Sequence, residues 1–344
     1  MPRAQFLPAA WNARLAALLQ LIRRHPGLLA LCGFVGGLAS FLLVERHAGL
    51  ARVIALVMLA SWVWLTLENL LRDCLARRFG LRVPPLLLRY LTQLVHQESL
   101  FFVLPFFAVT TAWNSAQGLF TGLLGLAALV AITDPLYYRA LAPRRGLYLA
   151  YHGLTLFAVL LVTLPLILHL STAQSYPLAL AIATLLSLAS LHGRLRAARW
   201  RRSLALVALL LALAAAGWLL RAWVPPATLW MTDMQVSQRF DTRQRVPGAP
   251  LQRIDTATLR AQGLYAFSAI SAPRGLNEHI EHVWLHEGVE IDRITLQIRG
   301  GREQGYRAWS HKLRFPAQPT GRWQVRVQTA GGQLLGTLRF RVED

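Results

Sequence analysis

The sequence predicts a polytopic α-helical membrane domain with about seven transmembrane helices, followed by a small all-β, immunoglobulin-like sandwich. Three observations lead to this fold class. Of the 344 residues, 55% are hydrophobic and 15% are charged, whereas soluble globular domains usually carry about 25% charged residues. Apolar runs of bilayer-spanning length fill most of the chain before Val224. After Val224 the pattern changes to short alternating runs broken by Gly, Pro and Asn, which is typical of strands and turns.

The expected domains follow these changes of pattern. Residues 1–25 form a basic cytoplasmic leader, residues 26–223 the membrane domain and residues 224–344 a periplasmic β-sandwich, tethered by the short segment Val224-Pro225-Pro226. We expect no cleavable signal peptide, because the first apolar run begins only near Pro26 and lacks a small-x-small cleavage pattern. Cys32 and Cys74 both fall in the membrane half, and we expect no disulfide between them.

Seven apolar runs are the predicted membrane spans. A helix rises about 1.5 Å per residue, so roughly 20 residues cross a ~30 Å hydrocarbon core. The third and fourth spans meet at a polar turn, the fifth and sixth meet at an uncharged turn, and the third and sixth are the shortest. The spans are residues 26–44, 50–71, 99–113, 117–136, 147–170, 176–191 and 203–220.

Arginine asymmetry gives the orientation. The leader and the loops after the second, fourth and sixth spans are rich in arginine, whereas the alternate connections hold Arg46 and Arg52 or none. Short basic loops stay in the cytoplasm, so we expect an inner-membrane protein with a cytoplasmic amino terminus and a periplasmic carboxyl terminus. The net charge of +20 therefore reflects membrane insertion, and we expect no nucleic-acid partner.

Seven segments after Val224 alternate between apolar and polar residues, and we expect them to pair as antiparallel strands of a sandwich. In the last two strands one face is apolar and the other is basic and exposed to water. The predicted strands are residues 227–240, 264–271, 279–286, 289–298, 306–315, 323–329 and 333–342.

Several short stretches carry a resemblance to known families. The segments 282–288 (HVWLHEG), 308–312 (AWSHK), 321–327 (GRWQVRV) and 338–342 (LRFRV) resemble the domain of unknown function 2914, over roughly the last 65 residues. The segments 96–102 (HQESLFF) and 134–138 (DPLYY) resemble the domain of unknown function 5924, the membrane part of such bacterial proteins. The resemblance implies a bacterial membrane protein with an outward β-domain, and it implies no activity or catalytic residue.

Polar side chains of the membrane half form a candidate polar site at the cytoplasmic level. Ionisable groups at the centre of a membrane helix cost about 2.5–3.5 kcal/mol and are therefore functional candidates. Near helix ends the same groups can instead hydrate, cap helices or pair with Arg72, Arg89 or Arg139. A purely structural role is therefore the alternative to a functional site. A functional site of this kind would bind a divalent cation, relay protons or handle a lipid headgroup. The candidates are Glu68, His96, Glu98, Asp134, Tyr138 and His152, with Tyr137 beside them.

The candidate binding surface of the sandwich consists of Trp284, Trp309, Tyr306 and Arg307. Exposed aromatic rings beside arginines would suit stacking on sugars or peptides, while a tryptophan in a small sandwich also commonly belongs to the core. His282 and His286 lie four residues apart, about 13 Å along a regular strand, so they cannot share a metal ion. No spacing matches a known catalytic or metal motif, and no catalytic residue, cofactor or metal is assigned.

The preferred function is binding rather than catalysis. Besides the lipid bilayer, the partner would be an envelope glycan, lipid or protein that the periplasmic sandwich recognises. The alternative is a small transporter or lipid-modifying membrane enzyme that uses Glu98, Asp134 and His152. Convergence of these side chains on one water-accessible cavity would favour the alternative, and tight helix packing would favour the binding module.

Overall fold

The computed structural model describes residues 85–197, 200–302 and 304–344, together with single positions between residues 31 and 62. The leader, residues 63–84 with Glu68, and both cysteines lie outside the described residues, and the first two predicted spans are described only at those single positions. The chain divides into two compact units. The first unit comprises residues 1–105, 123–163 and 181–214, and the second comprises residues 106–122, 164–180 and 215–344.

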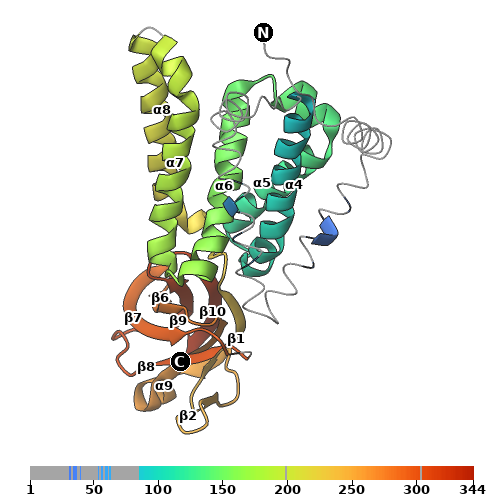
Figure 1. Ribbon diagram of the computed structural model, residues 1–344. Coiled ribbons are helices and arrows are strands. Elements are labelled where there is room, and N and C mark those ends of the chain that lie inside the picture. Colours follow the sequence, from blue (N-terminus) through green and yellow to red (C-terminus); the bar gives the residue numbers. More distant parts are fainter. Residues whose placement is uncertain are drawn as a thin grey trace, which may run out of the picture. The chain divides into compact units, whose positions relative to one another are not determined.

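Five α-helices precede the sandwich in the described part of the chain (Figure 1). A π-helix, η1, covers Pro135–Leu141, and a single 3-10 turn, η2, covers Arg221–Trp223. The α-helices are α4 (Pro85–Thr110), α5 (Gln117–Ile132), α6 (Arg145–Leu168), α7 (Thr172–Ala197) and α8 (Trp200–Leu219).

Helix α4 begins well before the predicted third span, so His96 and Glu98 lie inside a helix rather than at its entry. The predicted fourth span is broken: α5 ends at Ile132, and η1 leaves it at an angle of 101°. The cause is Pro135, which has no N–H to donate to the carbonyl of Ala131. That carbonyl instead accepts the side-chain amides of Gln93 at 2.9 Å and Gln97 at 2.7 Å.

Within the described residues, one helix, Gly146–Leu168, is long and apolar enough to cross a membrane. The bent pair of α5 and η1 would make a second if it counts as one span. Thr172–Leu188 and Ser203–Leu219 are apolar but shorter. The seven predicted spans are therefore not confirmed, in part because the first two fall almost wholly outside the described residues.

The carboxyl-terminal region is a β-sandwich of two main sheets. One sheet has the order β1-β5-β8 and the other has the order β4-β10-β9-β6-β7, while β2 and β3 form a separate hairpin. A short helix, α9 (Thr256–Gln262), follows β4. The strands are β1 (Trp230–Ser237), β2 (Phe240–Asp241), β3 (Val246–Pro247), β4 (Arg253–Asp255), β5 (Leu264–Ser271), β6 (Asn277–His286), β7 (Val289–Arg299), β8 (Tyr306–Lys312), β9 (Gly321–Thr329) and β10 (Leu334–Glu343).

The core lies between the two sheets, since residues of both sheets share one buried cluster. Trp284, Trp323 and Phe340 from the five-stranded sheet pack there with Val236 and Leu264 from the three-stranded sheet. The predicted strands are found, and β5 matches its predicted limits at both ends. The expectation of purely antiparallel pairing is wrong at one edge, because the short strand β4 pairs in parallel with β10.

The sandwich is held by more than the tether Val224-Pro225-Pro226. Within the second unit the backbone N–H of Thr172 donates to Glu278 at 2.6 Å. The side chain of Gln117 donates to the carbonyl of Leu334 at 3.0 Å. The ends of α5 and α7 are therefore fixed to the sandwich by hydrogen bonds across long sequence separations.

Candidate functional site

Two of the predicted polar residues of the helical part are in direct contact. His96 on α4 is fully buried, and its Nε2 lies 3.1 Å from Nδ1 of His152 on α6. Its Nδ1 lies 2.8 Å from the hydroxyl of Tyr137 in η1. The three side chains form a continuous hydrogen-bonded chain, which is the arrangement that a proton relay requires.

Aromatic rings enclose this chain. The ring of Trp62 lies 4.5 Å from that of His152, and the ring of Tyr151 lies 5.1 Å from that of His96. The hydroxyl of Tyr151 donates to the carbonyl of Ala127 at 2.9 Å. The histidine pair therefore lies in a packed aromatic environment, and the described residues contain no group of three metal-ligating side chains.

Asp134 and Tyr138 form a second, separate group around Gln93. The amide of Gln93 donates to Asp134 at 2.8 Å, and the hydroxyl of Tyr138 donates to the carbonyl oxygen of Gln93 at 2.6 Å. Asp134 thus has a glutamine partner, and among the described side chains it forms no ion pair with Arg139.

Glu98 does not belong to either group. Residues two apart on a helix point about 200° apart, so Glu98 faces away from His96. The carboxyl group of Glu98 lies near Gly36 instead, since a Cβ atom built on Gly36 would lie 3.6 Å from its Oε2.

The sequence analysis did not identify Gln93 and Gln97 as site residues. Residues 93, 96 and 97 follow the i, i+3, i+4 spacing of one helix face, and this pattern could have indicated them. Glu68 lies outside the described residues.

In the sandwich, Trp284 is not part of an exposed surface. Its exposed fraction is 0%, as are those of Ile280 and His282 on the same face of β6. This face points into the core because alternate residues of a strand share one side of the sheet. The prediction that Trp284 belongs to an exposed binding surface is therefore wrong. The other three predicted surface residues lie on β8.

His282 joins the two sheets through the core. Its Nε2 lies 2.9 Å from the hydroxyl of Ser268 on β5, and its Nδ1 lies 2.9 Å from the hydroxyl of Ser310 on β8. Burial lowers the pKa of His282 from 6.5 to about 4, because the interior disfavours the charged imidazolium. This histidine is a structural link between the sheets.

A row of neighbouring residues that includes two aromatic side chains crosses the outer face of the three-stranded sheet. Gln235, Phe267 and Trp309 are direct neighbours across β1, β5 and β8. The ring of Phe240 in the β2–β3 hairpin stacks on Trp309 with a centroid distance of 4.6 Å. The hairpin therefore folds over part of this face, and Trp309 is half-buried between the hairpin and the sheet.

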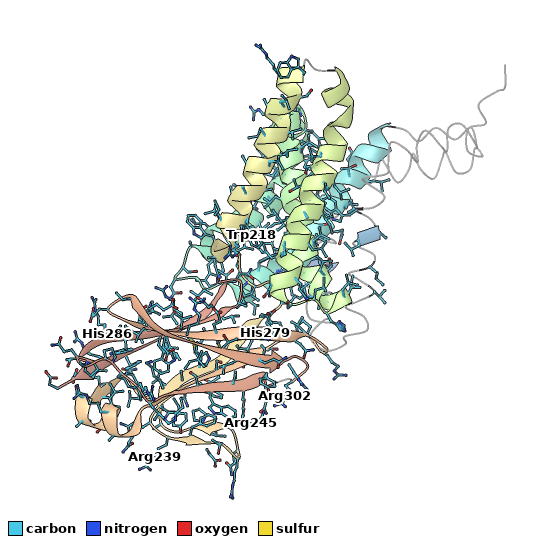
Figure 2. All side chains as sticks on the ribbon, turned by 90° about the vertical axis from the view of Figure 1, so that its left-hand side faces the viewer. Trp218, Arg239, Arg245, His279, His286 and Arg302 are labelled. Carbon is cyan, nitrogen blue, oxygen red and sulfur yellow. The ribbon has the colours of Figure 1, made fainter. Side chains whose placement is uncertain are left out.

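Two adjoining cavities open beside this row, and together we name them the arginine groove. They share Gln304 and Arg307 as lining residues and have volumes of about 230 and 450 Å³. The first also touches Asp233 and Phe267, and the second is lined by the cationic residues Arg245, Arg302 and Arg307. Arg245 and Arg302 lie on the same side of the sandwich (Figure 2).

Side-chain contacts fix the arginines in place. Arg307 donates to the side chain of Gln304 at 3.4 Å, and Arg302 lies 4.8 Å from the ring centre of Tyr306. Arg245 lies 5.7 Å from the ring centre of Trp309. In the described part of the chain none of the three groove arginines forms an ion pair with a carboxylate.

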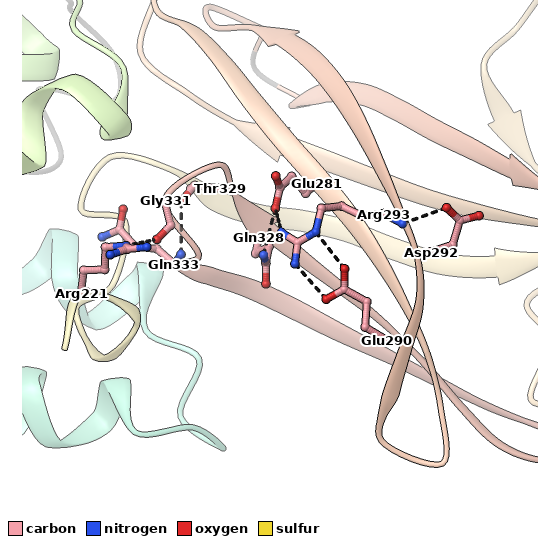
Figure 3. A network of polar contacts seen from close by, with 9 residues as sticks. All are labelled: Arg221, Glu281, Glu290, Asp292, Arg293, Gln328, Thr329, Gly331 and Gln333. Atoms are coloured by element: carbon pink, nitrogen blue, oxygen red, sulfur yellow. Dashed lines mark hydrogen bonds and ion pairs between the residues drawn. The ribbon is translucent and has the colours of Figure 1, made fainter. Parts of the chain in front are cut away.

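On the outer face of the other sheet, two arginines have acidic partners. Arg293 pairs with Glu281 and Glu290, as Figure 3 shows. Arg322 pairs with Glu287 at 3.2 Å. The three groove arginines have no such partner among the described residues, so their charge is available to a ligand.

Comparison with known proteins gives two family matches. Residues 8–266 match DUF5924, a family of unknown function. Residues 277–342 match a second family, DUF2914, which is described as a protein of unknown function. The first match extends into β5 and the second begins at β6, so the sandwich is built from both. No curated protein matches the chain, and no solved structure does.

Proposed function

We propose, from the premise that this chain belongs to the family of unknown function DUF5924, that its sandwich binds an anionic component of the bacterial envelope in the arginine groove. The chain would be a multi-pass inner-membrane protein of about seven spans, with a cytoplasmic amino terminus and a periplasmic, immunoglobulin-like sandwich. The helices would hold the sandwich beside the outer leaflet, within reach of envelope glycans and proteins.

The observation that carries the proposal is the set of three guanidinium groups that line one groove beside Trp309. Guanidinium groups bind carboxylate and phosphate oxygens with paired hydrogen bonds. The side chains of Gln244 and Gln304 in the same cavity add amide groups that can exchange hydrogen bonds with sugar hydroxyls. The ligand class that this combination fits is an acidic glycan, in which sugars carry carboxylate or phosphate groups.

Calorimetric titration of the full chain in phosphatidylcholine nanodiscs tests this function. The probes are a tri-galacturonate, an acidic peptide of the same charge, and maltotriose as a neutral sugar. We expect binding of the tri-galacturonate that weakens as salt is raised, because salt screens the guanidinium groups. Tighter binding of the peptide would reassign the ligand to a protein, and absence of binding by every probe would refute the groove as a binding site.

A matched pair of triple variants separates the groove from net charge. Replacement of Arg245, Arg302 and Arg307 by glutamine removes hydrogen bonds worth about 1.5–3 kcal/mol each, so affinity should fall at least about tenfold. The control replaces exposed arginines of the other sheet and removes the same charge, and it should change affinity less than about twofold. The control residues are Arg326, Arg339 and Arg341.

The second candidate function is proton-coupled transport or catalysis in the helical part. The chain of Tyr137, His96 and His152 favours it, since a buried hydrogen-bonded chain with two imidazoles can pass a proton along its length. The test is proton uptake into proteoliposomes by the wild type and by His96→Gln. Glu98→Gln is the matched control, because Glu98 is not part of the hydrogen-bonded chain. Equal uptake by all three proteins would remove this candidate.

A further inference from the structure

A separate cavity of about 200 Å³ lies where the ends of α7 and α8 meet the β9–β10 turn. All of its lining residues belong to the second unit. Tyr176 and Trp218 contribute aromatic side chains, and Arg221 contributes the one charged side chain among the lining residues. Thr172 and Gln333 add further polar groups.

Arg221 is held in position at this cavity. Its Nε donates to the carbonyl of Gly331 at 2.8 Å (Figure 3), and its guanidinium lies 4.9 Å from the ring centre of Trp218. Neither contact neutralises the charge, and the described residues give Arg221 no carboxylate partner. The cavity therefore contains a fixed positive charge.

Thr172 provides an independent sign of a ligand. It is only 7% exposed, and its hydroxyl has no hydrogen-bond partner among the described residues. A buried hydroxyl without a partner costs about 1–3 kcal/mol, so such groups commonly bind a ligand or an ordered water. The carboxyl group of Glu278 accepts the backbone N–H of Thr172 and also approaches the hydroxyl, but without the geometry of a hydrogen bond. The oxygen is shielded from solvent, so a rotation of the Thr172 side chain would be needed to turn its hydroxyl towards a ligand in the cavity that the residue lines.

Large apolar side chains stand exposed around the same helix ends. Trp218, Leu219 and Trp223 are 44%, 77% and 45% exposed, and Leu168 at the end of α6 is 58% exposed. Tryptophan together with arginine at the end of an apolar helix is typical of the membrane–water interface. Acyl chains would cover these residues while the headgroup of the same lipid lies beside Arg221.

From these contacts we propose that the cavity binds the phosphate group of an anionic phospholipid, with Arg221 and the hydroxyl of Thr172 as donors to its oxygens. Arg221 supplies charge-assisted bonds to a phosphate, and Thr172 completes its missing hydrogen bond. The cavity holds the headgroup, and the exposed tryptophan and leucine side chains contact the acyl chains. This inference rests on the membrane placement proposed above and not on the arginine groove.

Native mass spectrometry of the full chain in detergent tests the lipid site. The lipid probes are phosphatidylglycerol and phosphatidylcholine, and sn-glycerol 3-phosphate and inorganic phosphate serve as soluble competitors. We expect one phosphatidylglycerol to be retained at least about fivefold more than phosphatidylcholine, because the choline ammonium offsets the phosphate charge. Displacement by either soluble competitor at millimolar concentration would show that the site takes free phosphate and would overturn the lipid assignment.

Three single variants sharpen the test. Arg221→Gln should lose the retained lipid, whereas Arg201→Gln should keep it, although Arg201 also packs on a tryptophan, Trp200, at the other end of α8. Equal loss in both would mean a general charge effect and would overturn the site. Thr172→Val removes a hydroxyl that has no hydrogen-bond partner among the described residues, so it should fold normally and retain several-fold less lipid. Unchanged retention in this variant would also overturn the proposal.

The proposals for the arginine groove and for the lipid site can be tested independently of each other. The triple variant of Arg245, Arg302 and Arg307 should retain phosphatidylglycerol as the wild type does. If it loses the lipid as well, the retained lipid binds the groove and the cavity at Arg221 is not the site.

Discussion

Acidification should loosen the sandwich through His282. In the folded protein burial lowers the pKa of this histidine to about 4, whereas in the unfolded chain it returns to its ordinary value of 6.5. Between these two pKa values the imidazole is protonated in the unfolded state but not in the folded state. The free energy of unfolding therefore decreases as pH falls from 6.5 towards 4. Between pH 7.5 and pH 5 this linkage amounts to about 2 kcal/mol of the free energy of unfolding.

The measurement is amide hydrogen exchange of β5, β6 and β8 in the full chain at both pH values, compared with the variant His282→Gln. Glutamine keeps a donor and an acceptor for Ser268 and Ser310 but does not titrate in this range. Burial raises the pKa of Glu278, which gives a pH dependence of the opposite sign, and this contribution is the same in both proteins. If the two proteins lose protection equally within about 0.5 kcal/mol, the assignment of the effect to His282 is wrong.

Three further predictions concern single side chains. Glu278→Ala removes the carboxylate that accepts the N–H of Thr172 at 2.6 Å, and the free energy of unfolding should fall by about 1–3 kcal/mol, measured by chemical denaturation with the exposed Glu343→Ala as control. Asp255→Ala removes the cap at the start of α9, where Oδ1 accepts the N–H of Thr258 at 2.7 Å, and should speed the exchange of the first α9 amides, which is the local readout. Gly263→Ala should lower the melting temperature clearly, because φ is 69° and a Cβ atom would lie 2.5 Å from the carbonyl oxygen of Lys312; a melting temperature equal to that of the wild type would contradict this turn geometry.

Some features of this protein could be predicted from residue patterns because they depend on local periodicity. Alternation of apolar and polar residues located the strands, and β5 has the predicted limits. The motifs around His96 and His282 indicated both families in the order in which they match. The basic outer face of β9 and β10 also followed from alternation, since Trp323 and Phe340 are buried while Arg326 and Arg339 are exposed.

The tertiary structure decided which polar residues meet. Two carboxylates and two histidines near the same level of the chain were equivalent candidates by position, but the helical rotation of α4 joins His96 to His152 and turns Glu98 away. Gln93 has its role only because Pro135, far along the chain, leaves the carbonyl of Ala131 without a backbone donor. Neither fact can be read from local sequence.

The same division holds for the sandwich. Alternation shows that Trp284 and Trp309 each lie on one face of a strand, but it cannot tell which face is covered, because the answer depends on what packs against the sheet. The fold buries Trp284 between the sheets and places Trp309 beneath the β2–β3 hairpin. Local periodicity thus determined the strands themselves, whereas long-range packing determined the groove, the histidine link and the cavity at Arg221, because each joins residues from distant segments of the chain.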